Sequence, residues 1–219
     1  MQTSNDYNFI SSVVWPCVLA TLLAVIAPLS TAGEVKKTES GPVRVHIVAR
    51  GLEHPWGLAF LPDRRMLVTE RPGRLRIVET DGSVSPPLSG LPKITTRGQG
   101  GLLDVALHPG FEDNGLVYLS YAAKGRSGVG TEVARGRLEG NALVATEVIF
   151  RGMPKGRGGR HFGSRLVFHP DGSLFVTLGD RGDRPRAQRL DDHAGSVIRL
   201  DDKGAIPSNN PFVGRSGVN

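Results

Sequence analysis

The sequence predicts an all-β protein of the β-propeller class. A short alternating apolar run, a Pro-centred turn and a second apolar run recur three times, around Pro62, Pro109 and Pro170. Apolar runs of period two that are separated by Pro, Gly and Asp turns are typical of antiparallel hairpins. No segment keeps a helical period over a dozen residues. A repeat of roughly 40–50 residues, several strands long and without a helix, indicates propeller blades.

Each repeat predicts a pair of strands, and further strands are predicted between the repeats. The pairs are Leu58–Asp63 with Met66–Thr69, Val105–Gly110 with Leu116–Ser120, and Leu166–Asp171 with Leu174–Thr177. The additional strands are Leu75–Val78, Glu132–Leu138, Ala145–Phe150 and Ser196–Leu200. At roughly 50 residues per blade the chain has room for three to four blades, whereas closed propellers have about four to eight. We therefore expect an incomplete propeller in which three blades are recognisable.

The N-terminus predicts export of the protein. A mostly apolar run from Ile10 to Leu29 is followed by the small residues of 30–32, which predicts a signal peptide over 1–32 with cleavage after Ala32. No Lys or Arg precedes the apolar run, so an uncleaved N-terminal anchor is the alternative. Cleavage removes the single cysteine, and a thiol-free chain suits a periplasmic or secreted location. We expect no stable membrane insertion after cleavage, and a flexible polar lead-in over 33–43.

Composition excludes several classes of protein. With 27 Lys and Arg against 21 Asp and Glu, the net charge is +6, and the mean hydropathy of −0.15 fits a soluble globular protein. One cysteine excludes a disulfide scaffold or a Cys-based zinc site. The basic, Gly-rich run Arg151–Arg165 could bind nucleic acid, but its single aromatic residue and the export signal favour a solvated loop at the channel rim. No dinucleotide fingerprint is present, which argues against nicotinamide chemistry.

Several motifs in a fixed order resemble one known family. They are His54–Phe60, Gly98–Asp104, His161–Phe168, Leu178–Asp180 and Asp202–Phe212. Together they resemble the glucose/sorbosone dehydrogenase family, and within it the soluble aldose sugar dehydrogenases that use pyrroloquinoline quinone (PQQ). The resemblance runs over 44–219, which we expect to be one partial propeller domain. It implies a six-bladed propeller, with about the first three blades present here and the site at the wide mouth of the central channel.

The resemblance assigns roles to three residues. His161 is implied as the general base, because oxidation of an aldose at C1 removes a hydroxyl proton and His titrates near working pH. Asp180 is implied as the carboxylate that orients this imidazole. Gln99, between two glycines that let the backbone approach a ligand, is implied as a cofactor and substrate contact. The alternatives are a solvated His in a Gly-rich loop, an ordinary turn Asp, and a Gln that faces water.

The resemblance also implies partners and cofactors. The reaction would convert a sugar to its lactone with hydride transfer to PQQ, and an external acceptor, a quinone or a cytochrome, would take the electrons. Ca²⁺ is implied too, with its ligands and an Arg-Asn pair expected downstream of residue 219, so no metal ligand is assigned in this chain. Arg160 stands where some relatives have an acidic residue, which points to a different substrate preference. The competing hypotheses are a non-catalytic sugar- or protein-binding propeller, a degenerate fragment, and a metal-dependent lactonase.

Overall fold

The computed structural model describes residues 33–218. The described residues belong to two units, which divide between His46 and Ile47. The predicted signal peptide, which includes Cys17, lies outside the described residues. Its cleavage after Ala32 therefore stays a prediction. Within the described residues, no helix is long and apolar enough to cross a membrane.

The described part of the first unit is a hairpin. Strand β1 (Glu34–Thr38) pairs antiparallel with β2 (Gly41–Val45), and the Thr38 hydroxyl donates to the Gly41 carbonyl at 2.6 Å. Gly41 adopts a φ of +119°, which a side chain would disfavour. The lead-in predicted over 33–43 overlaps this hairpin, and its flexibility stays a prediction. Neither face of this hairpin is consistently apolar, so the hydropathy pattern did not predict its strands.

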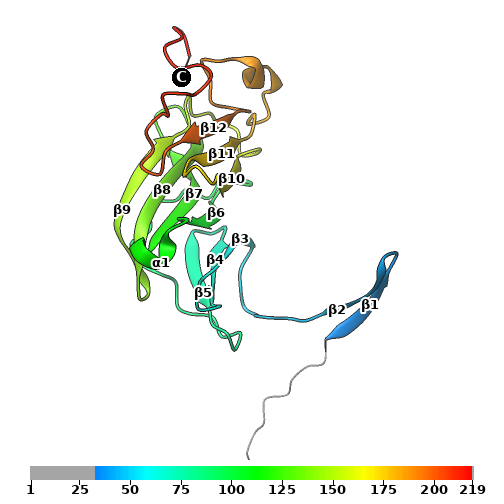
Figure 1. The fold of residues 1–219 in the computed structure, drawn as a ribbon. Helices are drawn as coiled ribbons and strands as arrows, with labels where there is room; N and C mark the ends of the chain where they lie inside the picture. Colours follow the sequence, from blue (N-terminus) through cyan, green and yellow to red (C-terminus); the bar gives the residue numbers. More distant parts are fainter. Residues whose placement is uncertain (1–32, 219) are drawn as a thin grey trace, which may run out of the picture. The chain divides into compact units, whose positions relative to one another are not determined.

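The second unit consists of three antiparallel sheets in which consecutive strands are neighbours (Figure 1). The first sheet contains β3 (Pro55–Phe60), β4 (Met66–Glu70) and β5 (Arg74–Val78). The second contains β6 (Leu102–Leu107), β7 (Leu116–Lys124), β8 (Val129–Glu139) and β9 (Ala142–Arg151). The third contains β10 (Gly163–Phe168), β11 (Leu174–Leu178) and β12 (Val197–Leu200). The helical segments are α1 (Phe111–Asn114) and the 3₁₀ turn η1 (Arg184–Gln188).

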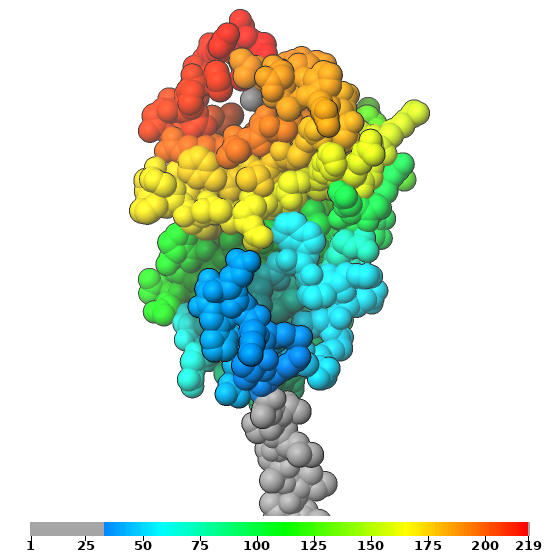
Figure 2. All heavy atoms as spheres, turned by 90° about the vertical axis from the view of Figure 1, so that its right-hand side faces the viewer, coloured from blue at the N-terminus to red at the C-terminus, as the bar shows by residue number. Residues whose placement is uncertain are grey.

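This arrangement confirms the prediction of an all-β, partial propeller. Every predicted strand is present, and β7, β8 and β9 extend beyond the predicted bounds. The first strands of the sheets face one another, because β6 contacts both β3 and β10. Each first strand also carries a register shift near its start, which bends it. In the space-filling view the sheets follow one another in sequence order, from cyan through green to yellow (Figure 2).

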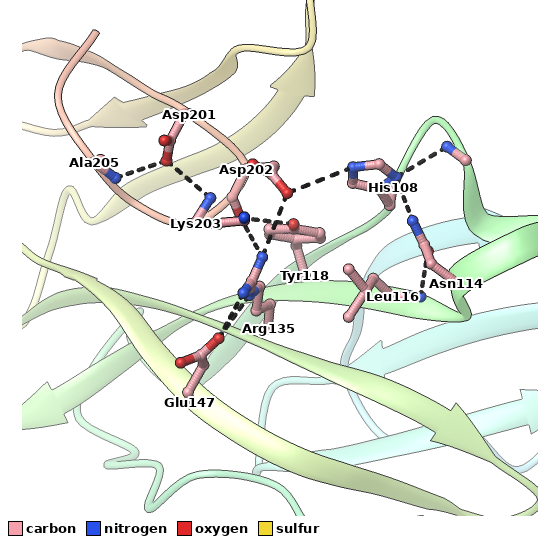
Figure 3. A network of polar contacts seen from close by, with 11 residues as sticks. His108, Asn114, Leu116, Tyr118, Arg135, Glu147, Asp201, Asp202, Lys203 and Ala205 are labelled. Atoms are coloured by element: carbon pink, nitrogen blue, oxygen red, sulfur yellow. Dashed lines mark hydrogen bonds and ion pairs between the residues drawn. The ribbon is translucent and has the colours of Figure 1, made fainter.

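Two apolar layers hold adjacent sheets together. The layer between the first and second sheets includes Leu67, Leu75, Ile77, Leu102, Leu119 and Tyr121, and the layer between the second and third includes Tyr118, Val133, Leu166, Leu174 and Val176. A polar network borders the second layer, where Arg135 bonds Glu147 and the Asp202 carbonyl (Figure 3). The Tyr118 hydroxyl donates to the same carbonyl at 2.7 Å. Alternating side chains thus fill the space between blades.

Buried hydroxyl groups join neighbouring sheets in a repeated way. Thr69 accepts the Gly57 N–H of its own sheet and donates to the Leu103 carbonyl of the next sheet. Ser120 in turn accepts the Asp104 N–H at 3.0 Å and donates to the Ser164 carbonyl at 2.7 Å. Each hydroxyl therefore satisfies main-chain groups at the bulge of two first strands. We call these contacts the hydroxyl bridges.

Replacing Ser120 with Ala is expected to lower the free energy of unfolding by about 1–3 kcal/mol. The change leaves a buried N–H and a buried carbonyl without the hydroxyl, and unpaired buried polar groups carry this penalty. Urea unfolding measures the effect. Ser127→Ala is the control, since its exposed hydroxyl also donates to a carbonyl, at 2.8 Å, but at the surface. Equal losses in the two variants would contradict the role given to the Ser120 bridge.

Candidate active site

The predicted site residues lie on loops that adjoin the first strands. Gln99 lies in the turn before β6, His161 precedes β10, and Asp180 follows β11. A hollow of about 460 Å³ opens among these loops. It is lined by Trp56, Arg71, Gly98, Gln99, Leu103, His161, Phe162 and Gly163. The structure therefore brings Gln99 and His161, which are 62 residues apart, into one site.

His161 and Asp180 form a hydrogen-bonded pair. The imidazole Nδ1 lies 2.7 Å from Asp180 Oδ1, and half of the imidazole surface is exposed. The Gly182 N–H, at 2.8 Å, and the His161 contact hold the pKa of Asp180 below its usual range. An ionised Asp180 accepts a hydrogen bond from Nδ1–H, and this tautomer leaves the lone pair of Nε2 available. This geometry is what a general base held in one tautomer requires.

Gln99 directly contacts the loop that carries His161, here called the base loop (residues 158–162). Its side-chain Oε1 accepts the His161 main-chain N–H at 2.8 Å, and its own N–H donates to the Gly159 carbonyl at 2.8 Å. Gly98 makes this approach possible, because its φ is +58° and a Cβ there would lie 2.2 Å from the Gly159 carbonyl. The resemblance implied a ligand contact for Gln99. The structure adds that its amide oxygen holds His161, which leaves its amide NH₂ group for a ligand.

Sequence reasoning gave no role to Trp56, Arg71 and Phe162, which also line the hollow. Arg71 follows β4 and donates from Nη1 to the Gly98 carbonyl at 2.7 Å. No carboxylate of the described residues lies within ion-pair distance of Arg71. Trp56 belongs to a motif that the resemblance used, which was a usable signal. Arg71 carried none, since only folding places the end of β4 beside the turn before β6.

The lining residues fit a planar organic anion better than a metal ion. Arg71 offers a cation that no carboxylate within residues 33–218 pairs with, Gln99 an amide, and Trp56 and Phe162 aromatic surface. In the described part of the chain, no group of three or more His, Cys, Asp and Glu side chains could hold a metal. The chemistry of this set therefore suits a carboxylate-bearing, flat cofactor beside a base.

The chain thus forms three propeller blades, with a hydrogen-bonded His–Asp pair beside a loop-lined hollow. The family model described as Glucose / Sorbosone dehydrogenase matches residues 52–219. The chain belongs to the glucose/sorbosone dehydrogenase family.

Known relatives agree with this assignment. The chain is 44% identical over 197 residues to the aldose sugar dehydrogenase YliI of Escherichia coli, covering 88% of this chain and 53% of that protein. The structure resembles the soluble aldose sugar dehydrogenase of E. coli in its apo form, with 46% identity, a TM-score of 0.77, and coverage of 80% of this chain and 51% of that one. It also resembles the PQQ-bound aldose sugar dehydrogenase of Streptomyces coelicolor, with 32% identity, a TM-score of 0.70, and coverage of 83% and 52%. The chain spans about half the length of these relatives.

Proposed function

We propose that this chain carries the base side of a PQQ-dependent aldose sugar dehydrogenase site. The observation that supports the proposal most is the contact of His161 with Asp180 at 2.7 Å, because His161 lines the same hollow as Gln99 and Arg71. The reaction is oxidation of the C1 hydroxyl of an aldose to the lactone. The PQQ-bound relative from Streptomyces coelicolor supports the choice of cofactor.

The residues of the chain divide the chemistry among them. Nε2 of His161 takes the proton of the C1 hydroxyl, while the ionised Asp180 stabilises the imidazolium that forms. When bound, PQQ supplies the acceptor for the hydride that leaves C1. Arg71 would bind one of its carboxylates, and the Gln99 amide would contact cofactor and sugar. Proton and hydride together account for the two-electron oxidation.

The wider setting is part of the proposal. The resemblance implies a Ca²⁺ ion beside the cofactor, with its ligands beyond residue 219. It also implies an external quinone or cytochrome as the electron acceptor. Export to the periplasm or the exterior follows from the predicted signal peptide. An aldose sugar is the proposed substrate class.

The proposal predicts PQQ binding and sugar-dependent dye reduction. The complete enzyme, with the part that is expected to hold the Ca²⁺ ligands, is titrated with PQQ in the presence of Ca²⁺. The cofactor absorption is followed with and without glucose and an artificial electron acceptor. A change in absorption on binding, followed by bleaching on sugar addition, is the expected result. Lactone hydrolysis that needs metal but no acceptor would identify a lactonase instead. Sugar binding without any redox change would identify a binding protein.

A further inference from the structure

We propose that Arg181 is a positioning residue for His161, because it holds main-chain carbonyls before the base and the Phe162 ring after it. The inference rests on the proposed function only for its kinetic readout. Asp180 fixes the imidazole ring, and the next residue in the chain fixes the loop that carries the ring. The two consecutive side chains form a clamp, here called the 180–181 clamp.

The guanidinium of Arg181 contacts both neighbours of His161. Nη1 donates to the Arg160 carbonyl at 2.7 Å, and Nη2 donates to the Gly158 carbonyl. The Arg181 Cζ atom lies 3.4 Å from the centroid of the Phe162 ring. His161 is thus flanked by a carbonyl and a ring that the same guanidinium contacts.

Phe162 anchors the clamp to the protein interior. Its ring is 3% exposed and packs with Leu103, Ala122 and Val129. A cation over an aromatic face gains about 0.5–2 kcal/mol, depending on desolvation. The guanidinium therefore links the base loop to the core of the second sheet rather than to solvent.

The backbone on both sides of the clamp needs such support. His161 has a φ of +54° and Arg181 a φ of +61°, both in the left-handed region that non-Gly residues seldom adopt. Each such residue costs about 1–2 kcal/mol relative to a regular conformation. The surrounding contacts must therefore hold the loop in place. Gln99 and Asp180 supply two of them, and the Thr131 hydroxyl supplies a third by donating to the Phe162 carbonyl at 2.9 Å. Arg181 adds its contacts to the carbonyls of Gly158 and Arg160 and to the Phe162 ring.

The charge of Arg181 is held at a cost to folding. Burial, with the repulsion of Arg186 and Arg97, lowers the pKa of Arg181 to about 10. No carboxylate of the described residues pairs with it, and its buried Nε–H has no acceptor among them. An apolar side chain could cover Phe162 without that penalty. An apolar side chain could not donate hydrogen bonds to the carbonyls of Gly158 and Arg160. These two hydrogen bonds are what holds the base loop.

Amide hydrogen exchange by NMR tests the clamp without any cofactor. In Arg181→Met, the His161 N–H is expected to exchange about tenfold faster or more, because the loop opens locally, while amides of β7 and β8 keep their rates. Arg181→Lys retains a charged donor and is expected to recover part of the protection. Arg135→Met is the matched control, because the Arg135 guanidinium also donates to a partly buried main-chain carbonyl, that of Asp202, at 3.0 Å. It should not change exchange at His161.

The kinetic readout uses the complete holoenzyme. Arg181→Met is expected to lower kcat by roughly 10–100-fold with KM little changed, because the base is displaced while ligand contacts remain. Unchanged exchange at His161 in a folded Arg181→Met protein would overturn the proposal, and so would equal loss of protection throughout the sheets. If Arg181→Met does not fold, the exchange rate of the His161 N–H in Arg181→Lys tests the proposal instead, and a rate equal to that of the wild type would overturn it. Absence of turnover in the wild type would count against the proposed function, whereas the exchange result judges the clamp alone.

Discussion

Replacing His161 with Gln in the complete enzyme is expected to lower kcat by roughly 10²–10⁴-fold, which is the usual contribution of a general base. Glutamine has a similar size but no group that takes a proton near neutral pH. The fold should remain, since half of the imidazole is exposed and it packs in neither apolar layer. Steady-state kinetics of sugar oxidation, with unfolding curves beside them, measure the two effects separately.

The chain offers a matched control for this variant. His169 also pairs with a carboxylate, since its Nδ1 lies 2.9 Å from Asp171 Oδ1, but this pair lies in a turn after β10 and does not line the hollow. His169→Gln is expected to leave kcat unchanged. Asp180→Asn should retain the His161 contact but lose the charge, so its kcat should lie between those of the wild type and His161→Gln. Near-full activity in His161→Gln would remove that residue from its assigned role.

Replacing Glu70 with Gln is expected to lower the free energy of unfolding by about 2–4 kcal/mol at neutral pH. The Glu70 side chain is fully buried and accepts from Arg74 Nε at 2.7 Å, from Arg76 Nη1 at 3.1 Å and from the Glu53 N–H. Removing one partner of a buried ionic cluster leaves the others unsatisfied. The estimate is below the full range for buried pairs because Arg74 is partly exposed and also binds Glu53. Chemical unfolding measures the loss.

The same residue predicts a pH dependence. Burial acts to raise the pKa of Glu70, but the Arg74 hydrogen bond and the Glu53 N–H outweigh it, so the pKa lies below its ordinary value of 4.5. A carboxyl with a depressed folded-state pKa stabilises the fold above its ordinary pKa and loses that contribution as the pH falls through the lower value. The stability difference between wild type and Glu70→Gln should therefore shrink below about pH 4.5. Glu147→Gln, at a largely exposed carboxylate, is the control and should show a small, nearly pH-independent change. A constant difference for Glu70→Gln down to pH 3 would contradict the assignment.

Local sequence patterns determined most of the fold. The strands of each blade alternate apolar and polar residues, and Pro62, Pro109 and Pro170 mark the turn between the first two strands of each sheet. Strand ends were less predictable, because the register shift at the start of each first strand interrupts the alternation. The hairpin of β1 and β2 escaped prediction since its ladder has no apolar face.

The site was only partly predictable, for a physical reason. His161, Asp180 and Gln99 lie in motifs of unusual composition that a single stretch of sequence can carry. The contacts that hold them come from elsewhere in the chain, as the Arg71 bond to the Gly98 carbonyl shows. Such contacts depend on how one blade packs against the next, and the apolar periodicity of the sequence does not predict that packing. Nothing in the sequence pattern singled out Arg181, because its position over the Phe162 ring is a product of folding.

The hydroxyl bridges imply that the sheets behave as a nearest-neighbour array. Thr69 couples the first sheet to the second and Ser120 the second to the third, while Thr177 repeats the intrasheet half of the bridge by accepting the Arg165 N–H at 3.0 Å. Coupling energy then resides in the junctions, so damage at one junction weakens two adjoining modules and is felt less by a third. The loops that carry Gln99, His161 and Asp180 take no part in these bridges, which join main-chain groups of neighbouring sheets through one small hydroxyl each.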